Sequence, residues 1–187
     1  MKCFFRKISF PVTVALLLLF VALIATDTGT LFLNGFGVDS AGKLYVGRCH
    51  KIEVYEYGKL INTIDSRSGR GWAMTVVDDQ IIVANSTGVH TWDLNGNALK
   101  HDPDPGNMVA ELSMMKETQG TDGNQYQMKS RVFGITKITK GTEIIYRIPF
   151  EDICVRTSWL LAAILLFLEA HWDKTGNSSR TENNSEP

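Results

Sequence analysis

The sequence predicts an all-β domain, made of antiparallel β-meander blades of a partial β-propeller, flanked by N-terminal and C-terminal apolar membrane helices. Three observations lead to this prediction. A four-strand pattern recurs along the chain with a period of about 40 residues. Short runs alternate apolar and polar residues between turn signals. Two blocks, residues 8–25 and 157–168, are almost wholly apolar.

The first element is the apolar block at residues 8–25. It follows three basic residues: Lys2, Arg6 and Lys7. A charge-free run of this length is about enough to cross roughly 30 Å of hydrocarbon. The positive-inside rule then predicts a cytoplasmic amino end, a cell-membrane location and an extracytoplasmic β domain. We favour a retained signal anchor at residues 1–26 over a cleaved signal peptide, for which Ala22 and Ala25 offer small residues near a cleavage point.

The middle of the chain, residues 27–152, contains the recurring unit. One shift along the sequence superposes two pairs of runs: residues 44–47 on 81–84, and residues 52–55 on 89–92. A third, looser copy begins at Asp122. Each copy has the length of one four-stranded propeller blade.

Alternation and turn signals define the expected strands of each unit. The first unit has strands at residues 31–39, 43–48, 51–57 and 60–64. The second has strands at residues 72–77, 80–85, 89–94 and 98–100. The third has strands at residues 108–115, 125–130, 132–138 and 143–148. The pair Asn95-Gly96 predicts a hairpin, because both residues tolerate positive φ. Residues 107–117 also fit one face of a helix, so this alternative stays open.

Two copies carry a similar turn followed by a strand. Residues 39–46 read Asp-Ser-Ala-Gly-Lys-Leu-Tyr-Val, and residues 122–126 read Asp-Gly-Asn-Gln-Tyr. Apolar or aromatic residues follow in the next strand: Ile52, Tyr55 and Val132. Over about residues 31–149, this pattern resembles the blades of six-bladed β-propellers of the NHL and TolB-like kind. The resemblance implies the fold of a blade and does not specify an activity. The second copy departs from the motif at residues 77–80.

Three units are fewer than the four to eight blades that close known propellers. A homodimer would complete six blades and bury both open edges. Alternatively, the chain is a shortened relative with an edge exposed or covered by the C-terminal helix. The units could also form a twisted open sheet or a small barrel.

The last elements are an apolar helix at residues 153–172 and a polar tail at residues 173–187. Trp159 and Trp172 stand where interfacial aromatic residues are expected, so we predict a transmembrane helix. The alternative is a buried or interfacial helix packed on the β domain. The Asn- and Ser-rich tail is predicted to be disordered.

Blade topology predicts where a ligand would bind. The loops that join blades lie on the same face as the loop between each blade's second and third strands, which places residues 66–71 beside His50 and Asn85. Arg67 and Arg70 in this Gly/Ser loop could hold a carboxylate, a phosphate or an acidic glycan through charge-assisted hydrogen bonds. We therefore predict four ligand-binding residues: Arg67, Arg70, His50 and Asn85. The alternative is a solvated loop.

The sequence gives no reason to expect catalysis or a cofactor. It contains no nucleophile elbow, phosphate-binding loop, dinucleotide fingerprint or zinc spacing, so no catalytic residue, metal or cofactor is predicted. Its three cysteines do not form a disulfide framework. A formal net charge of −1 gives no electrostatic reason to expect nucleic acid.

These observations favour a membrane-anchored extracytoplasmic binding module without catalytic activity. Its expected partners are the membrane and a protein, peptide or glycan ligand. Two alternatives stay open: a metal-dependent hydrolase or lactonase of the six-bladed propeller type, and a membrane sensor or assembly component.

Overall fold

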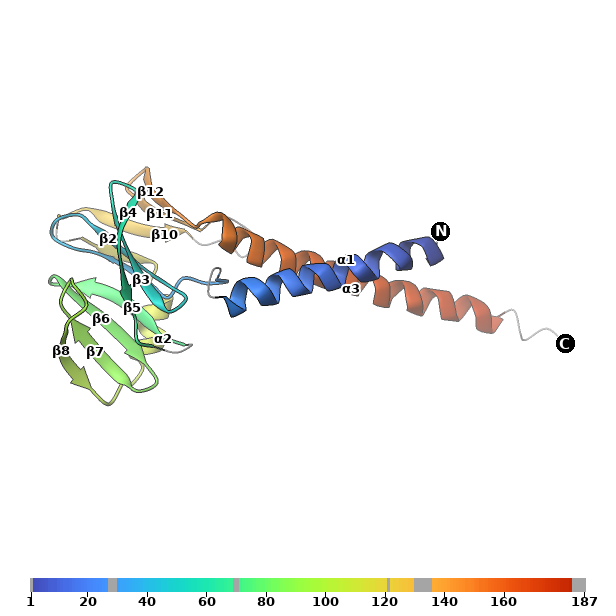
Figure 1. Cartoon of the computed structure of the whole chain (residues 1–187), viewed down its shortest axis with the longest axis horizontal. Helices are drawn as coiled ribbons and strands as arrows, with labels where there is room; N and C mark the ends of the chain where they lie inside the picture. The colour runs from blue at the N-terminus through green and yellow to red at the C-terminus, as the bar shows by residue number, and fades with distance from the viewer. Residues whose placement is uncertain (1, 27–29, 69–70, 121, 130–135, 183–187) are drawn as a thin grey trace. The chain divides into compact units, whose positions relative to one another are not determined.

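The computed structural model of the chain describes residues 2–26, 30–68, 71–120, 122–129 and 136–182 (Figure 1). Contacts divide the chain into two units. One unit is Thr30–Phe150, and the other combines Met1–Gly29 with Glu151–Pro187. The described residues form three helices and twelve strands.

Two of the helices belong to the terminal segments. Helix α1 spans Lys2–Ala25 and contains Pro11, and helix α3 spans Phe150–Glu182. Cys49 and Cys154 are not joined in a disulfide bond.

The transmembrane predictions for residues 1–26 and 153–172 are wrong, because no helix within the described residues is long and apolar enough to cross a membrane. A span needs about 20 predominantly apolar residues. The predicted fold class is corrected accordingly: helices flank the β domain, but none of them meets the length and apolarity of a membrane span within the described residues.

The strands form three four-stranded antiparallel sheets in the described part of the chain, each a simple meander (Figure 1). Sheet 1 contains β1 (Phe36–Val38), β2 (Leu44–Arg48), β3 (Lys51–Glu56) and β4 (Lys59–Asp65). Sheet 2 contains β5 (Ala73–Val77), β6 (Gln80–Asn85), β7 (Gly88–Trp92) and β8 (Ala98–Asp102). Sheet 3 contains β9 (Glu117–Gln119), β10 (Gln125–Lys129), β11 (Lys137–Lys140) and β12 (Glu143–Arg147).

Tight turns set the register of these meanders. Tyr57 and Gly58 link β3 to β4 with φ of 48° and 74°, and Asp78 and Asp79 link β5 to β6 with φ of 50° and 56°. Two consecutive positive φ values are the mark of the type I′ turn, whose twist suits a two-residue hairpin. The hairpin at Asn95-Gly96 differs from this pattern, since only Gly96 has a positive φ, of 87°.

The third unit departs most from the predicted strands. Helix α2 spans Met108–Met114, where a strand at residues 108–115 was expected. These residues form a helix because its apolar face packs on sheet 2, where Leu112 contacts Ala73 and Ala84. The strand predicted at residues 132–138 lies mostly outside the described residues, and β11 begins at Lys137.

Apolar contacts give the order of the layers in unit Thr30–Phe150. One face of sheet 1 packs on sheet 2 through a shared core that includes Tyr45, Val54, Met74 and Val83. Sheet 2 is covered on its opposite face by α2. Sheet 3 lies against the other face of sheet 1, where the rings of Tyr55 and Tyr146 meet edge to face at 5.1 Å. The order is therefore sheet 3, sheet 1, sheet 2 and α2.

Glycines in and beside β1 allow sheets 1 and 2 to approach closely. Gly35 forms a parallel bridge with Met74, and the Met74 N–H donates to the Asn34 carbonyl at 2.7 Å. A Cβ on Gly37 would lie 2.2 Å from the Val76 nitrogen. Only a residue without a side chain fits between these two backbones.

We expect Gly37→Ala to lower the free energy of unfolding by at least about 2 kcal/mol, because β1 and β5 must move apart. Gly106→Ala is the control. Gly106 has a positive φ of 48° but nothing within 4 Å of its added Cβ, so its cost is limited to the backbone, about 1 kcal/mol. Urea unfolding of the two variants measures the difference. Equal losses would show that the approach of β1 to β5 is not constrained.

Candidate functional site

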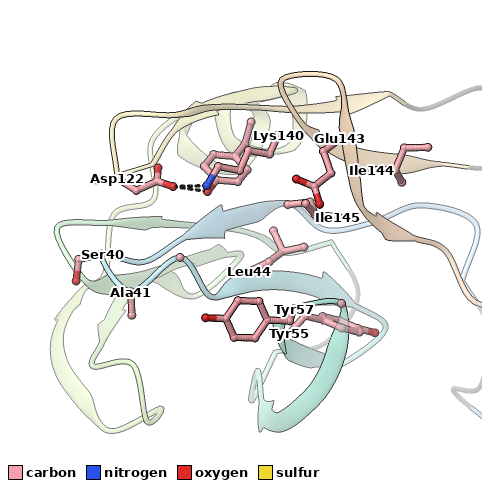
Figure 2. A pocket seen from close by; sticks show the side chains of 13 residues that line it. Ser40, Ala41, Leu44, Tyr55, Tyr57, Asp122, Lys140, Glu143, Ile144 and Ile145 are labelled. Atoms are coloured by element: carbon pink, nitrogen blue, oxygen red, sulfur yellow. Dashed lines mark hydrogen bonds and ion pairs between the residues drawn. The ribbon is translucent and has the colours of Figure 1, made fainter.

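A pocket of about 630 Å³ lies between sheet 1 and sheet 3 (Figure 2). Its walls combine aromatic and aliphatic side chains with a few charged groups. Sheet 1 and its turns contribute Ser40, Ala41, Gly42, Leu44, Tyr55, Tyr57 and Gly58. Sheet 3 and its turns contribute Asp122, Tyr126, Lys140, Glu143, Ile144 and Ile145.

Asp122 organises the sheet 3 wall. Its Oδ2 accepts hydrogen bonds from the Tyr126 hydroxyl at 2.7 Å and from the Lys140 ammonium at 2.9 Å (Figure 2). The Asn124 side chain donates to the same oxygen at 2.8 Å, and the Asn124 N–H donates to Oδ1 at 3.0 Å. The Lys140 ammonium also lies 5.7 Å from the centre of the Tyr126 ring. The carboxylate thus fixes one aromatic ring and one cation at the pocket wall.

These contacts set the ionisation of all three groups. Burial alone would raise the pKa of the Asp122 carboxyl, but the hydrogen bonds from Tyr126, Lys140 and Asn124 outweigh it and hold this pKa well below its usual range. The hydrogen bond to Asp122 raises the pKa of Lys140. Burial, followed by the same carboxylate, raises the pKa of Tyr126. At neutral pH the wall therefore holds an ion pair and a neutral phenol.

Two tyrosines belong to the sheet 1 wall, and they differ in how many contacts the protein makes with their side chains. The Tyr55 hydroxyl donates to Glu53 at 2.7 Å, and Glu53 is also paired with Arg48 at 3.1 Å. Burial and this hydrogen bond raise the pKa of Tyr55. Tyr57 is 98% exposed and sits at the first positive-φ position of its turn. The fold therefore secures Tyr55 and leaves the Tyr57 ring free for other contacts.

Glu143 is the third charged residue of the lining. It opens β12 after the turn at Gly141, and Figure 2 shows its side chain directed from sheet 3 into the space between the sheets. Its carboxylate has no hydrogen-bond or ion-pair partner among the residues that the structure describes.

Three of the four predicted ligand-binding residues, His50, Arg67 and Asn85, lie at the end of sheets 1 and 2 away from the pocket. His50 Nδ1 lies 3.0 Å from the Ser68 carbonyl oxygen, and the Asn85 amide donates to the Ser68 hydroxyl at 2.8 Å. The structure thus brings His50, Asn85 and the loop beginning at Ser66 together. Arg67 is exposed, with a φ of 50°. Arg70 lies outside the described residues.

Asn85 is buried, and its side-chain amide makes three hydrogen bonds. Besides its bond to Ser68, its Oδ1 accepts hydrogen bonds from the N–H and the hydroxyl of Thr87, at 2.8 and 2.6 Å. His50 and Asn85 therefore hold the loop, and whether Arg67 and Arg70 bind an anion stays a prediction.

Sequence reasoning missed the pocket residues as a site. It recognised Asp122 and Tyr126 only as part of a blade motif. The available signal was the recurrence of that pair, because Asp39 and Tyr45 make the same contact, hydroxyl to Oδ2, at 3.2 Å. The approach of sheet 3 to sheet 1, which creates the pocket, has no local sequence signature.

No group of three or more histidine, cysteine, aspartate or glutamate side chains that could hold a metal ion occurs in the described portion of the chain. No protein-family model matches the sequence, and no curated protein matches it.

We expect Asp122→Asn to lower the free energy of unfolding by about 1–2 kcal/mol at pH 7, because it removes a charged acceptor of several hydrogen bonds. The folded-state pKa of Asp122 is depressed, so its stabilisation is present above about pH 4 and is lost as pH falls through that low pKa. The variant should therefore lose less stability than the unmodified chain between about pH 4 and pH 2.

Urea unfolding across this pH range measures the effect. Glu111→Gln, at an exposed position on α2, is the matched control and should behave like the unmodified chain. An acid dependence unchanged in Asp122→Asn would contradict the assigned ionisation.

Asn85→Ala should cost about 1–3 kcal/mol, since it leaves the buried Ser68 hydroxyl and the Thr87 N–H without their partner. Arg67→Ala, at an exposed side chain of the same region, should change stability by less than about 0.5 kcal/mol. Thermal or urea unfolding compares them. If Asn85→Ala were as stable as Arg67→Ala, the amide would not be holding the loop.

Proposed function

We propose that this chain is a non-catalytic binding module whose ligand occupies the pocket between sheet 1 and sheet 3. The pocket volume of about 630 Å³ falls within the range of small-molecule sites, roughly 300–1,000 Å³. Its walls also have the usual composition of such sites, apolar and aromatic surface with a few polar groups that orient a ligand. A side chain of a peptide or one unit of a glycan would also fit a site of this kind.

The observation that carries the proposal is the state of Tyr57. Glycine and asparagine suit the first position of a type I′ turn, whereas a bulky residue there stores strain. With 98% of its surface exposed, Tyr57 gains little packing in return. An exposed aromatic side chain at the edge of a pocket provides a large contact area for a ligand at low entropic cost. Contact with a ligand would therefore explain why a tyrosine occupies position 57, where it does not stabilise the fold.

Binding is favoured over catalysis by the ionisation of the wall. General acid or base catalysis at neutral pH works best with a group whose pKa lies near 7. The pKa of Asp122 is instead held low, and those of Tyr126, Lys140 and Tyr55 are raised. These shifts fix each group in its ordinary neutral-pH form, which suits recognition and not proton transfer.

The loop that contains Arg67 and Arg70 stays a second candidate surface, for an anionic ligand. The predicted homodimer also stays a prediction.

We expect Tyr57→Asn to weaken ligand binding in the pocket by about 3–10-fold, because it removes an aromatic contact, and to keep the fold, because asparagine tolerates positive φ. Tyr57→Phe retains the ring and should bind like the unmodified chain. The probes are fragments of anionic, neutral and cationic type, titrated into the full chain and followed by amide chemical shifts of Gly42, Gly58 and Ile145. Fragments that shift only amides near Ser68 would refute this site.

A further inference from the structure

We infer that the ligand of the pocket between sheet 1 and sheet 3 carries a cationic group, an ammonium or a guanidinium, at the end of an apolar stem. This inference rests on the proposed function and adds the chemical class of the ligand.

The first argument is the charge balance of the lining. Asp122 and Lys140 form an ion pair at 2.9 Å and neutralise each other. Glu143 is the remaining charged residue of the lining and has no partner within the described residues. The pocket therefore has one uncompensated negative charge, which attracts a cation and repels an anion.

The second argument is the hydrogen-bonding capacity that remains. Asp122 already accepts bonds from Tyr126, Lys140 and Asn124. Ser40 donates its hydroxyl to Asp79 at 2.6 Å, and Tyr55 donates its hydroxyl to Glu53. These donors are engaged within the protein, so they are poorly placed to bind an anionic ligand.

Of the two carboxylates in the lining, Glu143 is the one without a partner among the described residues. A carboxylate without a partner forms a strong, charge-assisted hydrogen bond with an ammonium or guanidinium. Glu143 therefore supplies what a cationic ligand needs and what an anionic ligand cannot use.

The third argument is the surface around Glu143. Aliphatic side chains from both walls, Leu44 of sheet 1 and Ile145 of sheet 3, lie near Glu143 (Figure 2), and Ile144 also belongs to the pocket lining. They can cover a hydrocarbon stem. The Tyr57 ring adds an exposed aromatic face, which attracts cations through its quadrupole. An apolar stem with a positive end therefore matches both the walls and the free charge.

Two sources present this chemistry: a free alkylamine, and a lysine or arginine side chain of a peptide. The test begins with three probes that share one stem and differ in the head group: hexylammonium, hexanol and hexanoate. Each is titrated into the full chain by NMR, with the amides of Gly42, Gly58 and Ile145 as reporters. We expect hexylammonium to bind about tenfold more tightly than hexanol, and hexanoate to bind most weakly.

Glu143→Gln tests the role of the free carboxylate. It should weaken hexylammonium about tenfold, remove most of the salt dependence of its binding, and leave hexanol unchanged. Glu111→Gln changes the same atoms on α2, away from the pocket lining, and should have no effect. Hexanoate binding as tightly as hexylammonium, or Glu143→Gln leaving hexylammonium affinity intact, would overturn the cationic class.

The same titrations separate this inference from the proposed function. If hexanol changes the chemical shifts of the pocket amides and binds as tightly as hexylammonium, the pocket binds ligands but the ligand is not specifically cationic. If no probe and no fragment shifts these amides, both proposals fail. Titration with the capped peptide acetyl-Gly-Lys-Gly-amide identifies the source. If the peptide binds more tightly than hexylammonium, the natural ligand is a basic peptide. If hexylammonium binds more tightly, the natural ligand is a free amine.

Discussion

The close contact between β1 and β5 is the constraint on which the rest of the β domain depends. Gly35 and Gly37 bring the two backbones together, and the Thr75 hydroxyl donates to the Phe36 carbonyl at 3.3 Å. Strand β1 also contacts β2 and β9, so it touches all three sheets. If β1 shifted, sheet 1 would lose its register with sheet 2, and its other face would no longer meet sheet 3. The pocket exists because both faces of sheet 1 are occupied.

Turn chemistry then shapes the pocket. In sheets 1 and 3, an aspartate in the turn between the first two strands accepts a hydrogen bond from a tyrosine in the following strand. This arrangement orders the turn and buries the ring. Asp79, in the first turn of sheet 2, accepts bonds from the N–H and the hydroxyl of Ser40 at 2.7 and 2.6 Å, and these bonds hold its pKa below the usual range. The pocket wall at Ser40 is therefore tied to sheet 2 as well.

Much of sheets 1 and 2 could be predicted, because short runs of strand-forming residues are separated by turns with characteristic residues. Prediction failed where the outcome depends on distant contacts. The sequence of residues 108–115 fits both a strand and a helix. The helix α2 forms because the face of sheet 2 opposite sheet 1 offers an apolar surface on which it packs. The membrane assignment relied on two apolar runs, but no described helix is long and apolar enough to span a membrane. The pocket was missed because Asp122 and Glu143 meet Leu44 only after sheet 3 packs on sheet 1.

The two outer layers of the β domain limit how many such units can be joined. In repeat proteins, terminal elements with a polar outer surface stop further stacking. Here α2 occupies the face of sheet 2 on which another sheet would pack, while the outward face of sheet 3 presents Gln119, Gln125 and Gln127. A fourth sheet inserted by duplication would have to displace a helix or cover glutamine side chains. Further stacking on sheet 2 would therefore cost the contacts that α2 already makes there.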